Sequence, residues 1–192
     1  MSDLSPQDRK RLLQIARSSI AAELGETEPA DRPPSPSPPL QQPQGCFVTL
    51  QKSGALRGCI GTLEPKTPLI DAVAENAKNA AFHDPRFSPL TKEELGSVDI
   101  EISRLTVPVK LEFGSPEELL ERLKPGVHGV ILSRGWRRAT FLPQVWDQLP
   151  DKIRFLEHLC QKAGMGGGCW KATDLSIQVY EVEHFSEKEI GA

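Results

Sequence analysis

The sequence predicts one α+β domain in which helices flank a mainly antiparallel sheet. Two pairs of apolar segments, within residues 46–62 and 130–142, are each joined by a short turn, which is typical of β-hairpins. Segments with helical spacing stand between groups of strands rather than after every strand, and this favours α+β over a doubly wound parallel fold. A chain of 192 residues can bury a core of its own without cross-links.

The N-terminal part predicts a helix followed by a connector. Ser5 can cap a helix that has Pro6 at its first position, and Gly25 is a natural helix end. Residues 26–44 are rich in Pro, Ser and Gln, which indicates an extended spacer rather than a ligand for an SH3-like partner. The expected organisation is a single domain over 1–192, with a helix in 1–25, a connector over 26–44 and a body over 45–192.

The first predicted hairpin contains Cys46 and Cys59. Residues 46–50 form its first strand, residues 52–55 the turn and residues 56–62 the second strand. If Gln51 faces Leu56, then Val48 faces Cys59, and Cys46 lies diagonally from Cys59 on the same sheet face. The elements expected after it are a helix over 67–81, a capped short helix from Thr91, a strand over 98–103, a helix over 115–123, a hairpin over 130–142, a helix over 153–163 and a final strand over 175–181.

Composition restricts the functional classes. A formal net charge of −3 and a pI near 5.9 argue against nucleic-acid binding. No apolar run approaches the length of a membrane span, and the N-terminus does not resemble a signal peptide. We therefore expect a soluble, cytoplasmic protein with no nucleic-acid or membrane partner. Its cysteines are expected to be reduced, with Cys160 in the core and Cys169 more exposed. The spacing of Cys and His predicts no metal site, the glycines at 166–168 do not form a phosphate loop, and any cofactor stays unknown at the level of sequence.

Cys59 is the most distinctive candidate for a chemical role in the chain. It lies between Gly58 and Gly61, and Arg57 precedes it on the same face of an extended strand, where a guanidinium would favour the thiolate. His83 or His128 would be a base only if the fold brought it close. The alternative is a small buried thiol in a glycine-containing strand.

A second motif, residues 84–87, lies in a loop that contains two prolines. Asp84 and Arg86 could orient a polar substrate, or they could pair with each other and fix the loop. Both interpretations stay open at the level of sequence.

Five segments in this order resemble the family named for the AMME-syndrome candidate protein, whose bacterial and archaeal members are called AmmeMemoRadiSam system protein A. The resemblance extends roughly from Cys46 to Phe185. The segments are Phe47-Val48-Thr49-Leu50, Leu56-Arg57-Gly58-Cys59-Ile60-Gly61-Thr62, Asn79-Ala80-Ala81-Phe82, Asp84-Pro85-Arg86-Phe87 and Phe141-Leu142-Pro143-Gln144-Val145.

The resemblance implies two α+β subdomains that share a cleft, and it supplies no settled activity. It also implies partners: a Memo-type protein, similar to metal-dependent extradiol dioxygenases, and a radical-SAM protein. The leading hypothesis is an enzyme or enzyme component that uses Cys59 as nucleophile or ligand; the rival is a non-catalytic binding or scaffold module. A redox or metal pair of Cys46 and Cys59 is a third hypothesis. The candidate site residues are Cys59 and Arg57 for catalysis and Gly58, Gly61, Thr62, Asp84 and Arg86 for ligand or substrate binding.

Overall fold

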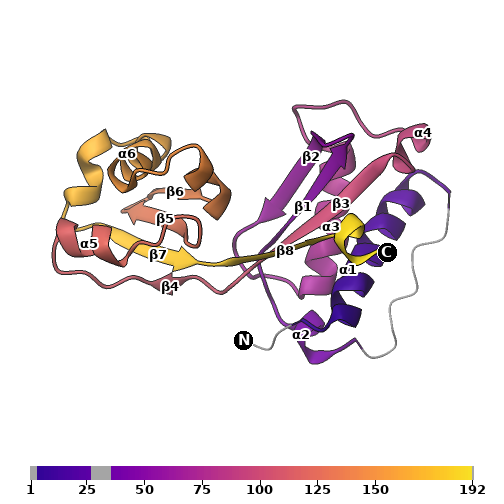
Figure 1. The fold of residues 1–192 in the computed structure, drawn as a ribbon, viewed down its shortest axis with the longest axis horizontal. Coiled ribbons are helices and arrows are strands. Elements are labelled where there is room, and N and C mark those ends of the chain that lie inside the picture. Colours follow the sequence, from indigo (N-terminus) through magenta and orange to yellow (C-terminus); the bar gives the residue numbers. More distant parts are fainter. Residues whose placement is uncertain (1–3, 27–35, 192) are drawn as a thin grey trace. The chain divides into compact units, whose positions relative to one another are not determined.

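The chain folds into two compact units, each built on a four-stranded antiparallel sheet with helices (Figure 1). The structure is a computed structural model and describes residues 4–26 and 36–191. Unit 1 comprises Met1–Leu105 and Glu183–Ala192, and unit 2 comprises Thr106–Val182. The predicted α+β class and the mainly antiparallel pairing are confirmed.

Unit 1 begins with the predicted N-terminal helix. Ser5 and Asp8 form its capping box, and Gly25 follows its end with a φ of 70°. Residues 27–35 of the predicted connector lie outside the described residues, and a short helix forms within its last part. The elements of unit 1 are α1 (Pro6–Glu23), α2 (Pro38–Gln41), β1 (Cys46–Lys52), β2 (Ala55–Thr62), α3 (Leu69–Phe82), α4 (Lys92–Leu95), β3 (Val98–Leu105), β8 (Val182–Ser186) and α7 (Glu187–Ile190), with the sheet order β2-β1-β3-β8.

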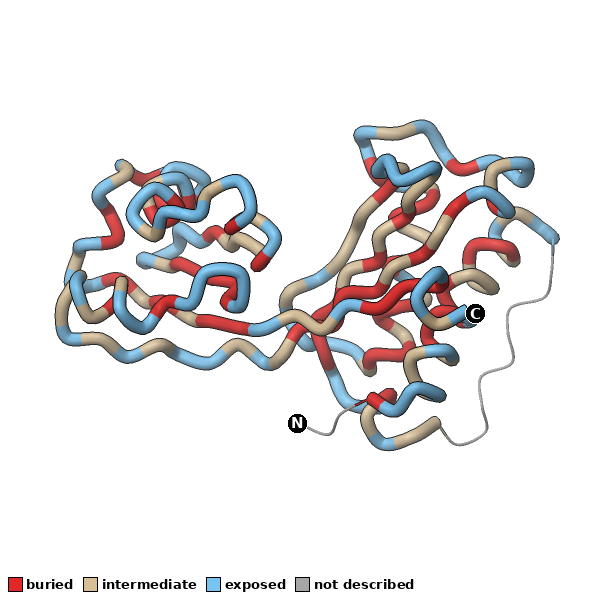
Figure 2. Tube along the Cα trace, in the orientation of Figure 1, coloured by how far each residue is buried: buried red, intermediate tan, exposed pale blue. Residues whose placement is uncertain are grey.

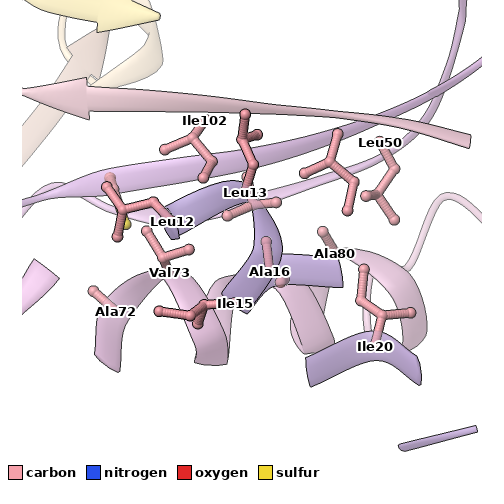
Figure 3. Packing of buried hydrophobic residues seen from close by; sticks show 14 of the residues in the cluster. Leu12, Leu13, Ile15, Ala16, Ile20, Leu50, Ala72, Val73, Ala80 and Ile102 are labelled. Atoms are coloured by element: carbon pink, nitrogen blue, oxygen red, sulfur yellow. The ribbon is translucent and has the colours of Figure 1, made fainter. Parts of the chain in front are cut away.

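The core of unit 1 lies between its sheet and the helices α1 and α3. Side chains of both helices meet those of the strands in one layer, as Figure 3 shows for Leu13, Val73 and Ile102. These three residues are fully buried. Each large apolar side chain buried in this way contributes about 1.5–3 kcal/mol, and this packing fixes which face of each strand points to the helices.

The register of the first hairpin differs from the prediction. Gln51 does face Leu56, but a β-bulge between Leu50 and Gln51 shifts the pairs beyond it, so that Cys59 faces Thr49. The predicted opposition of Val48 and Cys59 was therefore wrong. Cys46 pairs with Thr62 and lies in the core beside the helices, whereas Cys59 points to the other face of the sheet. A bulge inserts one extra residue into a strand, so every residue beyond it points to the sheet face opposite to the one expected without the bulge. No pattern in the sequence indicated this bulge.

Unit 2 contains the second predicted hairpin, now β5 and β6, in a sheet of order β4-β7-β5-β6. The predicted final strand is β7, and a further strand, β8, follows it after Glu181 and pairs in unit 1. Figure 2 shows a buried interior in each unit. The elements of unit 2 are β4 (Val109–Lys110), α5 (Pro116–Arg122), β5 (Gly129–Arg134), β6 (Arg137–Phe141), η1 (Pro143–Asp147), α6 (Lys152–Lys162), η2 (Gly167–Lys171) and β7 (Ser176–Tyr180).

The expectation that every cysteine is a free thiol was wrong. Cys160 of α6 and Cys169 of η2 form a disulfide, with their Cα atoms 5.9 Å apart. Gly164, at a φ of 70°, turns the chain after α6, and η2 then packs back against that helix. Cys169 is consequently buried rather than exposed. The expectation of reduced thiols depended only on the expected cytoplasmic location. It did not take into account the turn that brings the two sulfur atoms together.

Reduction of this disulfide is expected to destabilise unit 2 by roughly 2.5 kcal/mol, because it releases a short loop in the unfolded chain. The three tryptophans, at positions 136, 146 and 170, all belong to unit 2, so denaturant unfolding followed by tryptophan fluorescence reports on this unit. A Cys160→Ala, Cys169→Ala variant should show the same loss and no further change on adding reductant. Equal stability of the oxidised and reduced chains would contradict a stabilising role of the bond.

Within residues 4–26 and 36–191, no helix combines the length and the apolar character that crossing a bilayer requires.

Candidate functional site

The signature around Cys59 lies on β2, a strand at the edge of the sheet of unit 1. Gly58 is buried against α3, and a Cβ atom at this position would stand 2.1 Å from the carbonyl oxygen of Ala80. The missing side chain therefore allows the C-terminal end of α3 to approach β2. This approach brings the loop after α3, which begins with His83 and Asp84, to the outer edge of the strand.

Asp84 and Arg86 bind the main chain of Cys59 from that edge. The Cys59 N–H donates to Oδ2 of Asp84 at 2.9 Å, and Nη2 of Arg86 donates to the Cys59 carbonyl at 3.2 Å. The two side chains also bond to each other, with Nε of Arg86 2.9 Å from Oδ1 of Asp84. On an edge strand, a neighbouring strand would normally bond to such N–H and carbonyl groups. Here the side chains of Asp84 and Arg86 bond to those of Cys59 instead.

Charge interactions within this ion pair are strong. Asp84 is buried, and the hydrogen bond from Arg86 lowers its pKa far below the ordinary value, with a further contribution from the Cys59 N–H. The pKa of Arg86 is raised, first by its hydrogen bond to Asp84 and then by the negative charges of Asp84 and Cys59. Asp84 is therefore ionised throughout the physiological range, and the Arg86 guanidinium bonds both to Asp84 and to the main chain of Cys59.

The thiol of Cys59 lies half-exposed on the sheet face opposite to α1 and α3. The Thr49 hydroxyl on β1 donates to its Sγ at 3.3 Å. All four cysteines are within the described residues, and Cys59 is the one that is both free and not buried. Cys46 is buried next to Asn76, and burial raises its pKa to about 11. Cys46 and Cys59 point to opposite faces of the sheet, so the third hypothesis, a redox or metal pair of these two residues, is not supported by the structure.

Arg57 contacts Glu94 and Phe87. Its guanidinium donates to both carboxylate oxygens of Glu94, at 3.2 and 2.9 Å, and lies 5.9 Å from the centre of the Phe87 ring. Lys52 bonds to the same carboxylate at 2.9 Å, and the hydrogen bonds from Arg57 and Lys52 lower the pKa of Glu94 to about 2. Arg86 lies 5.6 Å from the same ring. The Phe87 ring thus lies close to both guanidinium groups, those of Arg57 and Arg86.

The remaining predicted residues have separate positions. A Cβ atom at Gly61 would stand 2.3 Å from the Phe47 ring, so this glycine makes room for an aromatic side chain on the Cys59 face. Thr62 pairs with Cys46 at the end of β2, is exposed and points to the opposite face from Cys59. His83 is exposed and bonds to Asn79, whereas His128 belongs to unit 2.

The structure brings Cys59, Asp84 and Arg86 together, and it adds Thr49 to them. We call these four residues the Cys59 site. Sequence reasoning missed Thr49, although it lies within a segment that was identified, because its position opposite Cys59 depends on the bulge. Glu94 belongs to the capped short helix that was predicted from Thr91, and its ion pair with Arg57 had no signal in the sequence.

Comparisons with known proteins show which proteins the chain resembles in fold and sequence. A solved structure of an uncharacterized protein from Pyrococcus horikoshii is similar to the chain with a TM-score of 0.81 and 34% identity, over 95% of this chain and 92% of that one. A protein of Methanothermobacter thermautotrophicus is 40% identical over 96% of both chains. A protein of Methanopyrus kandleri is 40% identical over 97% of this chain and 91% of its own. The sequence model of the AMMECR1 family matches residues 13–185, and the chain therefore belongs to the AMMECR1 family.

Proposed function

We propose that the chain is a thiol-dependent enzyme or enzyme component in which Cys59 is the nucleophile. The observation that carries this proposal is the arrangement of the Cys59 site, where the thiol is accessible, accepts a hydrogen bond from Thr49 and stands beside the cation of Arg86. A hydrogen-bond donor and a nearby positive charge both favour a thiolate, which is the reactive form of cysteine.

The charge around the site suggests the class of substrate. The Arg86 side chain is 53% exposed and donates to the main chain of Cys59, so a cation is open to solvent next to this residue. An electrophile that carries a carboxylate or phosphate would be attracted to this surface and held with its reactive carbon near Sγ. The proposed substrate is therefore a small anionic electrophile.

Alkylation with a matched pair of reagents tests both parts of the proposal. Cys59 should react with iodoacetamide at neutral pH roughly ten times faster in the folded chain than in the unfolded chain, because the fold places a hydrogen-bond donor, Thr49, and a cation, Arg86, beside it. The ratio of the folded-state rate to the unfolded-state rate should be larger for anionic iodoacetate than for neutral iodoacetamide. Arg86→Gln should lower the iodoacetate rate more than the iodoacetamide rate, and Thr49→Val should lower both.

The control for this measurement is Cys59→Ser, which should abolish labelling under native conditions, since Cys46 is buried and the other two cysteines are bonded to each other. A folded-state rate equal to or below that of the unfolded chain would count against a nucleophile. In that case the same surface would be better explained as a non-catalytic binding module.

We also propose that the chain acts together with a Memo-type and a radical-SAM protein. Membership of the family supports this proposal, because the family resemblance associates its members with proteins of these two classes. Titration calorimetry with each purified partner tests it, and absence of binding heat with both, at concentrations up to about 100 μM, would exclude a stable complex.

A further inference from the structure

A polar row crosses the sheet of unit 1 on the face that carries Cys59. Thr49 of β1 faces Cys59 of β2 on one side and Glu101 of β3 on the other. Directly opposed residues of antiparallel strands point to the same face, so the thiol, the hydroxyl and the carboxyl all project from one surface. Adjacent strands lie about 4.8 Å apart, which places Cys59 and Glu101 about 10 Å apart at the backbone.

Side-chain length gives this row its shape. Thr49 has the shortest side chain of the three and stands between the other two. Its hydroxyl is bonded to Sγ of Cys59. The Glu101 side chain is longer than that of Thr49 and projects from the same face. A reacting group bound over Thr49 would therefore have the sulfur on one side and the carboxyl on the other.

The surroundings of Glu101 favour its protonated form. The side chain is half-buried, and burial raises its pKa above the ordinary value. Asp99 of the same strand and Glu189 of α7 raise the pKa further, while His184 of β8 opposes them. A carboxyl group in such an environment holds its proton to a higher pH than an exposed one and can donate it.

We infer that Glu101 is the proton donor in an acyl transfer to Cys59, with the acyl carbon held above Thr49. This inference rests on the proposed function, because it needs Cys59 as the nucleophile. The thiol proton first passes to solvent, and the thiolate sulfur then bonds to the carbonyl carbon. The bond from that carbon to the leaving oxygen breaks, the electron pair goes to the oxygen, and this oxygen takes the proton of Glu101. Solvent returns a proton to the Glu101 carboxylate.

Two esters that differ in their leaving group test the role of Glu101. Acetyl transfer to Cys59 is followed by intact-protein mass spectrometry with p-nitrophenyl acetate, whose leaving group needs no proton, and with trifluoroethyl acetate, whose leaving alkoxide does. Glu101→Gln should slow transfer from trifluoroethyl acetate roughly a hundredfold, the size of a general-acid effect, and leave the p-nitrophenyl rate within about twofold. The matched control is Glu112→Gln, the same substitution at an exposed carboxylate of unit 2, and it should alter neither rate.

The outcomes separate this inference from the proposed function. Equal rates in the unsubstituted chain and Glu101→Gln with both esters, or an equal loss with both, would overturn the role of Glu101 while Cys59 remained a nucleophile. Absence of acetyl transfer from either ester to the unsubstituted chain would overturn the proposed function, and the inference with it. Selective loss with trifluoroethyl acetate supports both.

Discussion

Gly58→Ala is expected to destabilise unit 1 by about 3 kcal/mol, because the new methyl group meets a main-chain atom that cannot move alone. The clashing atom is the carbonyl oxygen of Ala80, 2.1 Å from the point where the methyl carbon would stand, within the last turn of α3. Relief of this contact requires α3 to separate from β2, which would break the packing of the core. Amide hydrogen exchange in the β1–β2 hairpin measures the loss within unit 1.

Gly96→Ala is the matched control for this substitution. Gly96 follows α4 with an ordinary helical φ of −71°, and a Cβ atom added there would meet no atom within 4 Å beyond its chain neighbours. Its stability should change by less than about 0.5 kcal/mol. If Gly58→Ala were as mild as this control, the close approach of α3 to β2 would not be a requirement of the fold. The Cys59 site should also loosen in Gly58→Ala, since Asp84 is carried by the loop after α3.

Asp84→Asn is expected to cost about 2–3 kcal/mol at neutral pH, because it removes the charge from a buried, charge-assisted set of hydrogen bonds. The cost should depend on pH with a definite sign. The folded-state pKa of Asp84 lies below its unfolded value of about 3.9, so its contribution is fully present above that pH and is lost as the pH falls toward the folded pKa. The difference between the two chains should therefore shrink in acid.

Urea unfolding at a series of pH values, combined with hydrogen exchange of the Cys59 amide, measures this effect. The Cys59 amide should exchange faster in Asp84→Asn, since its acceptor has lost its charge. Asp147→Asn, the same change at an exposed carboxylate in η1, is the control for the loss of a surface charge. A constant difference between pH 7 and pH 3 for Asp84→Asn would mean that the charge of Asp84 does not stabilise the fold.

Much of the fold could be predicted because it depends on local patterns. The capping box at Ser5, the helix end at Gly25 and the capped helix after Thr91 are all decided within a few residues, and each lies where its pattern indicated. The two hairpins were found for the same reason. β8 was missed because residues 182–186 have a weak apolar alternation and are a strand only through their pairing in the sheet of unit 1.

The candidate site was predictable in its residue types but not in its contacts. Cys59, Asp84 and Arg86 could be selected as chemically unusual, yet their joint position depends on the packing of α3 against Gly58. The expected neighbour of the thiol was Arg57, whose actual partner is Glu94, a residue of an element that local patterns cannot place in space. Glu101 lies within the strand that was predicted over 98–103, and the bulge in the hairpin decides that it shares a row with Cys59.

The position of β8 in the sheet has a consequence for the synthesis of the chain. β8 is the neighbour of β3 in the sheet order, and the whole of unit 2, Thr106–Val182, stands between these strands in the sequence. A ribosome must therefore add unit 2 before the last strand of the first sheet exists. Unit 2 is continuous and can fold as it emerges, whereas the nascent unit 1 waits with the β8 side of β3 unpaired until translation reaches residues 182–186.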